Sequence, residues 1–308
     1  MEHAVRAGRI VDPTWKTALV AAGMVLISPM DSAGSQPPLG EETRIYILAG
    51  QSNMSGRGSL DDLAAAERET NPRILAYGND GILKPAQEPI DSSLGQIDGV
   101  SADRLAAVGP GLFFARTMKQ SVKGPIVLVP CAKGGSSISR WKPGGGRDTL
   151  YGSCLARTRE VQGRLSGILW YQGESDTERE ASAEHYGQAF KALVDAFRRD
   201  LGAEGLPVVF AQIAEQPMRP ENAARYPAWE AIRRAQASLS IDCAEMVPVG
   251  ALPRQADELH LTTAAQRQLG GMMTEAMWRL QNNGCQGKRQ KTRSHRTSQS
   301  RVLTQGGF

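Results

Sequence analysis

The chain has 308 residues, of which 41% are hydrophobic and 22% are charged, so its composition is that of an ordinary globular protein. A collagen-like chain, a wholly disordered chain and a small disulfide scaffold are therefore excluded. The net charge is +4, but residues 34–285 carry 27 Lys and Arg against 29 Asp and Glu. No nucleic-acid partner is expected for this mildly acidic body.

The N-terminal region contains an apolar stretch of 12 residues, 17–28, which follows three basic residues. Spanning a bilayer takes about 20 residues, so no stable membrane span is expected. The pattern favours a signal peptide over residues 1–33, followed by a linker over 34–43, and hence a secreted or periplasmic protein. Asp31 is atypical of a cleavage site, and a frayed N-terminal helix is the alternative.

Apolar runs typical of buried strands alternate with helical patterns through the middle of the chain. Strands are predicted over residues 44–49, 73–77, 125–130, 167–171 and 207–213, with 244–249 as a candidate for a short sixth. Helices are predicted over residues 111–119, 150–165, 186–201, 229–239 and 264–280. This alternation predicts an α/β fold with a doubly wound, mostly parallel sheet of roughly five strands. Residues 78–108 have no clear periodicity, and we expect an ordered insertion near the site.

Ligands bind beyond the carboxyl ends of the strands in such a sheet, so the residues that follow each strand are the functional candidates. The first strand is followed by Gly50, Gln51, Ser52, Asn53 and Met54. A serine in a tight turn after a strand is a candidate nucleophile. Met54 occupies the last glycine position of G-x-S-x-G, so this is not the α/β-hydrolase elbow. A helix-capping role for the serine is the alternative.

Two later strands are followed by candidate donors of hydrogen bonds. After 125–130 come Gly134 and Gly135, whose backbone amides could form part of an oxyanion hole. The alternatives are a plain turn or a weak phosphate cradle, although the P-loop spacing is absent. After 167–171 come Gln172, Gly173, Glu174, Ser175 and Asp176, which place one amide donor and two carboxylates at the same rim.

Asp257 and His260 lie near the C-terminal end of the pattern, three residues apart. This spacing can bring a carboxylate to Nδ1 of the imidazole and fix its tautomer for proton transfer. Helix capping or surface charge is the alternative for so short a motif. His185 lies off the apolar stripe of its helix, which favours a surface role. Together the polar segments supply the parts that acyl transfer needs.

The four cysteines are Cys131, Cys154, Cys243 and Cys285, and they form no C-x-x-C pair. A zinc site is therefore not expected. In an exported protein they could form disulfides with any of three connectivities, and buried free thiols are the alternative. The tail, residues 286–308, has six Lys and Arg and no acid, which is typical of a disordered, solvated extension. Electrostatic anchoring to an acidic surface is the alternative.

Five stretches of the chain resemble the SGNH hydrolase superfamily. They read IYILAGQSNMSGRG, GPGLFFA, VPCAKGGSSISRW, GILWYQGESD and DELHLT, and they span about residues 44–262. More closely, the chain resembles the branch with sialate O-acetylesterase-type domains and the acetylxylan esterases of carbohydrate esterase family six. The resemblance implies a flavodoxin-like three-layer α/β/α domain over 44–285 with no metal or organic cofactor. Its substrate would be an acetylated carbohydrate, such as acetylated xylan, sialic acid or a related glycan.

The resemblance also implies roles for individual residues. Ser52 would be the nucleophile and His260 the general base, while the triad acid would be Asp257 or, as the alternative, Glu174. The oxyanion hole would be formed by the backbone amides of Ser52 and Gly135 and by the side chain of Gln172. Arg57 and Trp141 would shape the acyl or sugar pocket.

Three other functions are compatible with parts of the same pattern. The first is a lipase or thioesterase of the same superfamily, which would prefer longer acyl chains. The second is a non-catalytic carbohydrate-binding domain that kept the fold, and the third is an extracellular adhesion protein acting through its basic tail. The complete set of Ser52, Asp257 and His260 favours a serine esterase over the last two. The sequence predicts no oligomeric state.

Overall fold

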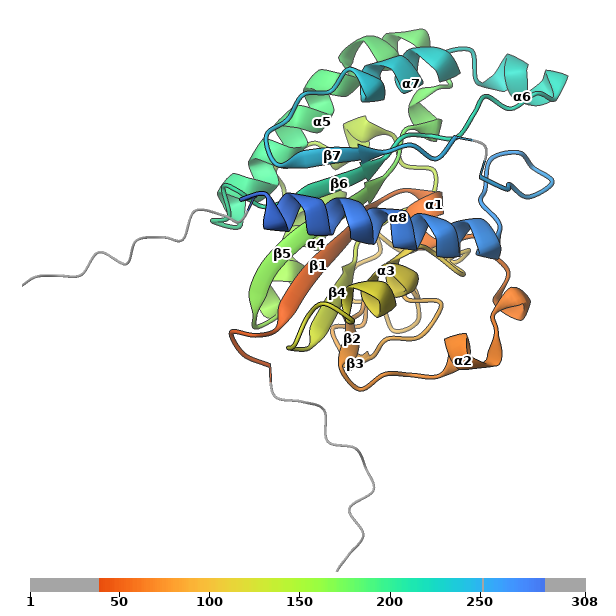
Figure 1. Cartoon of the computed structure of the whole chain (residues 1–308). Helices are drawn as coiled ribbons and strands as arrows, with labels where there is room; N and C mark the ends of the chain where they lie inside the picture. Colours follow the sequence, from red (N-terminus) through yellow and green to blue (C-terminus); the bar gives the residue numbers. More distant parts are fainter. Residues whose placement is uncertain (1–38, 251, 286–308) are drawn as a thin grey trace, which may run out of the picture. The chain divides into compact units, whose positions relative to one another are not determined.

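A seven-stranded sheet forms the centre of the computed structural model, which describes residues 39–250 and 252–285 (Figure 1). The strand order is β3-β2-β4-β1-β5-β6-β7, and every pair is parallel except β2 with β3. The strands are β1 Arg44–Gly50, β2 Ile74–Tyr77, β3 Leu83–Pro85, β4 Ile126–Pro130, β5 Arg164–Tyr171, β6 Val208–Ala211 and β7 Ala244–Val247. The predicted α/β fold with a mostly parallel sheet is confirmed, but the sheet is larger than the roughly five strands expected.

The difference in strand number comes from the two edges of the sheet. The central strands β1, β4 and β6 are almost wholly buried, which is why they appear as apolar runs in the sequence. The edge strand β7 is mostly half-buried, and β3 has only three residues, the middle one exposed. So short an edge strand leaves no apolar run, and β3 therefore escaped prediction.

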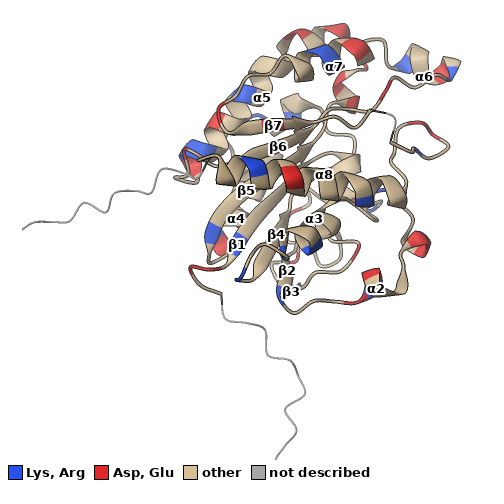
Figure 2. Ribbon diagram, viewed as in Figure 1, with Lys and Arg blue, Asp and Glu red and all other residues tan. Residues whose placement is uncertain are grey.

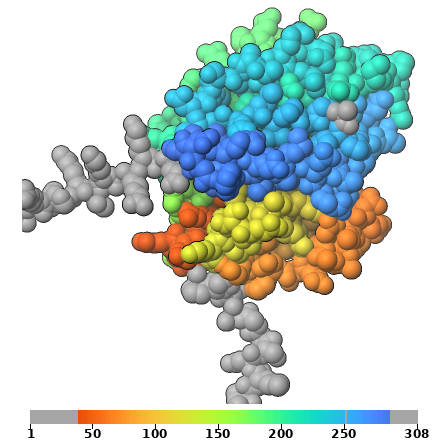
Figure 3. Space-filling view, viewed as in Figure 1, coloured from red at the N-terminus to blue at the C-terminus, as the bar shows by residue number. Residues whose placement is uncertain are grey.

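Helices cover both faces of the sheet and complete the three layers (Figure 1). On one face, Tyr46 of β1 packs edge-on against Phe114 of α3, with ring centroids 4.9 Å apart. The helix α8 lies on that same face, and Figure 3 shows its atoms directly against those of α3. On the other face, the ring of Trp170 in β5 packs against that of Phe190 in α5, with ring centroids 5.4 Å apart. The helices are α1 Ser52–Ser55, α2 Ala65–Arg68, α3 Gly111–Met118, α4 Leu150–Glu160, α5 Glu180–Asp200, α6 Pro220–Arg225, α7 Trp229–Ala237 and α8 Thr263–Asn282.

The prediction of a single helix over residues 150–165 is wrong at its C-terminal end. Helix α4 ends at Glu160, and β5 already begins at Arg164. The chain reverses through Gly163, whose φ of +145° is open to glycine but strained for other residues. The apolar Val161 and Leu165 had extended the helical pattern across this turn.

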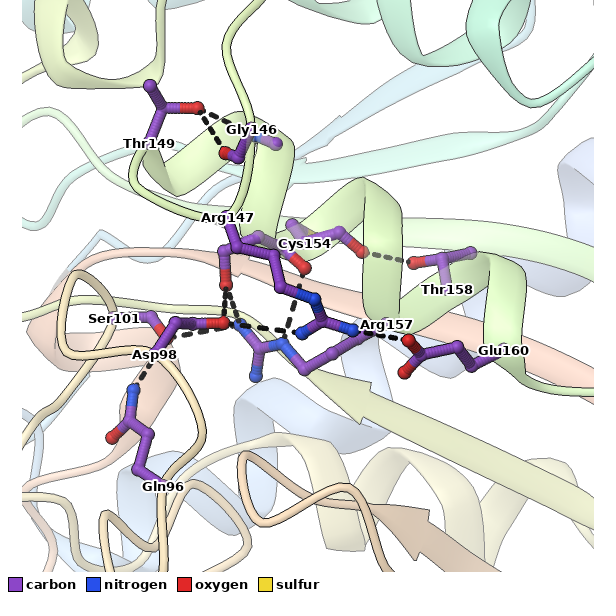
Figure 4. A network of polar contacts seen from close by, with 12 residues as sticks. Gln96, Asp98, Ser101, Gly146, Arg147, Thr149, Cys154, Arg157, Thr158 and Glu160 are labelled. Atoms are coloured by element: carbon purple, nitrogen blue, oxygen red, sulfur yellow. Dashed lines mark hydrogen bonds and ion pairs between the residues drawn. The ribbon is translucent and has the colours of Figure 1, made fainter.

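Residues 78–108 form the ordered insertion that the sequence predicted, and polar contacts hold it against α4 (Figure 4). The buried Arg157 of α4 donates from Nη2 to Ser101 Oγ at 3.2 Å and from Nη1 to the carbonyl oxygen of Pro130. Asp98 accepts from Ser101 Oγ at 3.2 Å and from Ser153 Oγ at 2.8 Å. The insertion is therefore tied to both α4 and the carboxyl end of β4.

All four cysteines are paired. Cys131–Cys154 joins the residue after β4 to α4, with Cα atoms 5.3 Å apart. Cys243–Cys285 joins the start of β7 to the segment that follows α8, with Cα atoms 5.2 Å apart. Among the three connectivities that the sequence left open, the structure has this one, and it has no free thiol among the four cysteines.

Charged residues of both signs are interspersed over the helices, as Figure 2 shows for α5, α7 and α8. This distribution agrees with the near balance of acidic and basic residues in 34–285. The predicted signal peptide, the linker up to residue 38 and the basic tail lie outside the described residues. Within residues 39–250 and 252–285, no helix has the length and apolarity needed to cross a membrane.

Two buried carboxyl groups face a small cavity under the turn that follows β1. Glu88 and Asp91 both line it, and Glu88 Oε1 and Asp91 Oδ2 have no hydrogen-bond partner. Burial raises the pKa of Glu88 to about 8, and the backbone N–H groups of Ile90 and Gly109 and then the charge of Arg116 oppose this rise. Burial likewise raises the pKa of Asp91 to about 7. Both groups therefore hold protons in the folded chain that they lose at lower pH in the unfolded chain.

We predict that the free energy of unfolding falls as the pH rises from about 5 to 8, and that Glu88→Gln flattens this fall. The folded protein binds more protons than the unfolded chain in this range, so alkali favours unfolding, and glutamine removes the contribution of Glu88. Thermal unfolding of both proteins at pH 5, 7 and 9 measures the effect. Glu204→Gln, at an exposed glutamate, is the control, and an unchanged pH dependence in Glu88→Gln would contradict the prediction.

Candidate active site

The polar segments predicted from the sequence meet at one edge of the sheet. Strand β1 lies between β4 and β5, and all three run in the same direction. The turns that follow them carry Ser52, Gly135 and Gln172. The segment between β7 and α8 brings His260 to the same edge. Such an edge is where α/β sheets bind ligands.

Ser52 is the first residue of α1, directly beyond β1. The turn needs Gly50, because its φ is +135° and a Cβ there would lie 2.1 Å from the carbonyl oxygen of Tyr171. The side chain of Ser52 is 6% exposed, and its Oγ lies 3.0 Å from Nε2 of His260. The hydroxyl is thus placed to donate its proton to the imidazole.

Asp257 completes a line of three hydrogen-bonded side chains. Its Oδ2 lies 2.6 Å from Nδ1 of His260, while its Oδ1 accepts the backbone N–H groups of Leu259 at 2.9 Å and His260 at 3.0 Å. Burial raises the pKa of Asp257, but the hydrogen bonds from His260 and Leu259 outweigh it and hold the pKa below its ordinary value. The carboxylate is therefore ionised and can orient the imidazole as in Ser-His-Asp triads.

Glu174, the alternative partner for the histidine, has a different contact. Its Oε1 accepts from Asn53 Nδ2 at 2.6 Å, and the structure does not bring it to His260. Asn53 also donates to the carbonyl oxygen of Leu259 at 3.1 Å and accepts the N–H of Leu261 at 3.0 Å. Asn53 therefore holds the chain on both sides of the histidine, and burial raises the pKa of Glu174 to about 7.

Two backbone amides of the site have no hydrogen-bond acceptor among the described residues and are the candidate donors to an oxyanion. Gly135 has φ of +68°, and a Cβ placed on it would meet no atom within 4 Å, so its surroundings are open. Within the part of the chain that the structure describes, the N–H groups of Ser52 and Gly135 have no acceptor. Both amides can therefore donate to a ligand without breaking an existing hydrogen bond.

Gln172, the third predicted donor, is fully buried. Its Nε2 lies 3.2 Å from Gln51 Oε1, 3.1 Å from the carbonyl oxygen of Ser136 and 2.5 Å from Asp176 Oδ2. Two N–H bonds facing three acceptors leave none free. An oxyanion role for Gln172 stays a prediction, and it would require the amide to release one of these partners.

The structure does not bring Trp141 to the surface of the site. The indole is fully buried, its Nε1 donates to Ser136 Oγ at 3.1 Å, and its ring packs edge-on against Trp170 at 5.2 Å. A full set of buried contacts excludes the predicted substrate contact for this side chain in this conformation. Arg57 is also engaged, in an ion pair with Asp103 at 2.8 Å, with 12% of its side chain exposed.

Sequence reasoning missed the supporting residues of the site. Asn53 stood inside the recognised GQSNM stretch, beside the candidate nucleophile, and could have been singled out as an amide that can both donate and accept. Asp103 lies in the aperiodic insertion, where no pattern marks it. Within the described ranges, no cluster of three or more His, Cys, Asp or Glu is placed to hold a metal ion.

A large cavity elsewhere lacks comparable chemistry. It has a volume of about 1260 Å³ and lies at the amino ends of β1 and β5, the edge of the sheet opposite Ser52. Arg44, Arg164 and Trp278 are among the residues that line it. Its described lining contains no histidine beside a nucleophile, so the candidate active site is the one around Ser52.

Comparisons with known proteins show which family the chain resembles. A model of the family described as "Carbohydrate esterase, sialic acid-specific acetylesterase" matches residues 42–279. A probable carbohydrate esterase of Arabidopsis thaliana is 34% identical over 250 residues, covering 76% of this chain and 89% of the relative. A probable 9-O-acetyl-N-acetylneuraminic acid deacetylase of Escherichia coli (strain K12) is 34% identical over 197 residues, covering 51% and 60%. A solved structure of an Arabidopsis thaliana protein superposes with a TM-score of 0.67 at 33% identity, covering 79% of this chain and 99% of that one.

We predict that Asp257→Asn slows the labelling of Ser52 by a serine-directed fluorophosphonate on the order of 10²- to 10⁴-fold, because an amide favours the wrong tautomer of the histidine. Glu174→Gln should slow it much less, since glutamine still offers Asn53 an acceptor. Labelling rates at equal folded fractions, checked by circular dichroism, measure the difference. A larger loss in Glu174→Gln than in Asp257→Asn would make Glu174 the partner of His260.

Proposed function

The chain belongs to the carbohydrate esterase family of sialic acid-specific acetylesterases and is an ester-hydrolysing enzyme, and we propose that it removes O-acetyl groups from a carbohydrate through an acetyl-enzyme on Ser52. One observation carries the proposal: Ser52 Oγ, the His260 ring and the Asp257 carboxylate form an unbroken hydrogen-bonded line with distances of 3.0 and 2.6 Å. Such a line is what activates a serine hydroxyl as a nucleophile.

The proposed reaction has two halves that use the same groups. In the first, His260 Nε2 takes the proton of Ser52 Oγ as Oγ bonds to the acetyl carbon. The backbone N–H groups of Ser52 and Gly135 stabilise the negative oxygen of the tetrahedral intermediate. The bond to the sugar oxygen then breaks, and His260 returns the proton to that oxygen. In the second half, water attacks the acetyl carbon while His260 takes a proton from it. The bond between that carbon and Ser52 Oγ then breaks, His260 returns the proton to Oγ, and acetate leaves.

We propose O-acetylated sialic acid as the first substrate to test, with acetylated xylan and related glycans as the other members of the class. The family description and the name of the Escherichia coli relative support sialic acid. The name of the Arabidopsis thaliana relative supports a carbohydrate ester more generally. A lipase or thioesterase would differ by accepting butyryl and longer chains as readily as acetyl.

We predict that the protein releases acetate from 4-nitrophenyl acetate and from either O-acetylated sialic acid or acetylated xylan. Ser52→Ala should abolish both activities while the fold persists. Acetate production by wild type, Ser52→Ala and the control Ser59→Ala, at an exposed serine of the same region, measures this. Ser59→Ala should keep the wild-type rate. Full activity in folded Ser52→Ala would overturn the mechanism, and equal rates for acetyl and longer esters would favour a lipase or thioesterase.

We also propose that the protein is exported to an oxidising compartment, secreted or periplasmic. The pairing of all four cysteines supports this, because disulfides persist mainly in such compartments. The apolar stretch at residues 17–28 is compatible with an export signal.

We predict that the unfolded but unreduced protein contains no reactive thiol, and that it contains four after reduction. Reduction should lower the melting temperature, since cross-links with sequence separations of 23 and 42 residues each contribute about 3–4 kcal/mol in the loop-entropy account. Thiol titration in denaturant, on protein isolated from its native host, provides the measurement. Four reactive thiols before reduction would contradict both the pairing and the proposed compartment.

A further inference from the structure

The insertion formed by residues 78–108 places one carboxylate, that of Asp103, between two parts of the active site. Asp103 is 4% exposed. Its Oδ2 accepts the backbone N–H of Gly134, the hydroxyl of Ser55 and Nη2 of Arg57, each at 2.8 Å. Its Oδ1 accepts Nη2 of Arg57 at 3.0 Å and the N–H of Leu105 at 3.1 Å. The carboxylate is thus saturated with donors.

Two of these donors belong to the segments that carry the reacting groups. Ser55 is the last residue of α1, whose first residue is Ser52, and Ser55 Oγ also lies 3.3 Å from the carbonyl oxygen of Ser52. Gly134 directly precedes Gly135, whose backbone N–H has no acceptor among the described residues. One carboxylate therefore joins the segment of the nucleophile to the segment of the oxyanion donor.

We propose that Asp103 is a positioning residue for the esterase reaction, which holds the Gly135 amide at the distance from Ser52 that the tetrahedral oxyanion requires. The inference rests on the proposed function. Donors of an oxyanion hole act only when they stand about 3 Å from the developing charge, so a small displacement of the Gly135 loop weakens them strongly.

The packing around Gly134 supports this role independently of the hydrogen bonds. A Cβ at Gly134 would lie 2.3 Å from Nη2 of Arg57 and 2.7 Å from Oδ2 of Asp103. Only glycine allows the loop to approach the ion pair this closely. The loop that contains Gly134 and Gly135 therefore packs directly against the Asp103–Arg57 pair. A displacement of the Asp103 carboxylate would displace this loop.

Asp103 is itself held in place and charged. Lys133 Nζ donates to the carbonyl oxygen of Ala102 at 2.6 Å. The buried Arg157 donates from Nη2 to Ser101 Oγ at 3.2 Å, so both residues before Asp103 are hydrogen-bonded (Figure 4). Burial raises the pKa of Asp103, but the hydrogen bonds and charge of Arg57 and the hydroxyl of Ser55 outweigh it, so the pKa lies below its ordinary value. The carboxylate stays ionised over the working range of an esterase.

The test is Asp103→Asn in the full-length enzyme. Both oxygens of Asp103 accept from Arg57 and from a backbone N–H, so in either orientation the NH₂ of asparagine faces other donors. This repulsion disturbs the contact between the ion pair and the Gly134 loop. We expect kcat for 4-nitrophenyl acetate to fall by about 10- to 10²-fold, less than the loss of a whole oxyanion donor, with KM changed by no more than about twofold. The inhibition constant of methylboronic acid, whose tetrahedral adduct on Ser52 uses the same donors, should rise by the same factor as kcat falls.

Asp98→Asn is the matched control. Asp98 lies in the same insertion and accepts from Ser101 and Arg147 (Figure 4) and from Ser153. Among the described residues, none of its hydrogen bonds or ion pairs reaches α1 or Gly134. It should lower the melting temperature and leave kcat and boronate inhibition within about twofold of wild type. If Asp103→Asn behaves like this control, the positioning role is overturned and Asp103 is a structural ion-pair partner.

A second variant keeps the test decisive if Asp103→Asn does not fold. Ser55→Ala removes one of the two links and leaves the carboxylate in place, and it should lower kcat and boronate affinity together, by a smaller factor. Unchanged values in Ser55→Ala would then overturn the proposal. Failure of the esterase function is seen separately, as absent acetate release by wild type or full activity in Ser52→Ala.

Discussion

The parallel pairing of β1 with β4 on one side and β5 on the other is the constraint on which the site depends. It brings the turns that follow three distant strands to one edge of the sheet. The approach of Gly50 to the carbonyl oxygen of Tyr171 shows how tight this junction is, since a Cβ would lie 2.1 Å away. Backbone pairing thus sets the position of Ser52 before any side chain contributes, and the helices on both faces serve to bury the strands that maintain it.

Buried carboxylates form a second level of support around this edge. Asp103 accepts the N–H of Gly134, Asp176 accepts the N–H of Ile138, and Glu174 accepts from Asn53. Removing a carboxylate from water costs several kcal/mol. The hydrogen bonds and the charge of Arg57 outweigh this cost at Asp103, whereas the hydrogen bonds offset it only in part at Glu174 and Asp176. Burial raises the pKa of Glu174 to about 7 and that of Asp176 to about 6, which reflects this cost. Their contribution is to the geometry of the loops more than to the stability of the fold.

The sequence predicted those parts of the structure that leave a regular signal. Buried parallel strands appear as apolar runs, so β1, β4, β5 and β6 were located closely, and Ser52, Asp257 and His260 stand out because they follow or flank such elements. The three-residue strand β3 leaves no such signal. The end of α4 was misplaced because apolar residues continue across the turn at Gly163. Asp103 could not be predicted, since it lies in an aperiodic segment and its contact with Gly134, 31 residues further along the chain, depends on the folded path alone.

The least predictable property was which hydrogen-bond donors are still free in the folded site. Gly135 and Gln172 both follow central strands, and by residue type an amide side chain is the more obvious donor. Among the described residues, the backbone N–H of Gly135 has no acceptor, whereas the Nε2 of Gln172 is shared among three buried oxygens. Trp141 illustrates the same limit, because an aromatic residue in a polar loop suggests a sugar contact until its ring is found packed on Trp170. A site inferred from residue types is therefore a set of candidates, and the competition for partners within the fold decides which of them face the ligand.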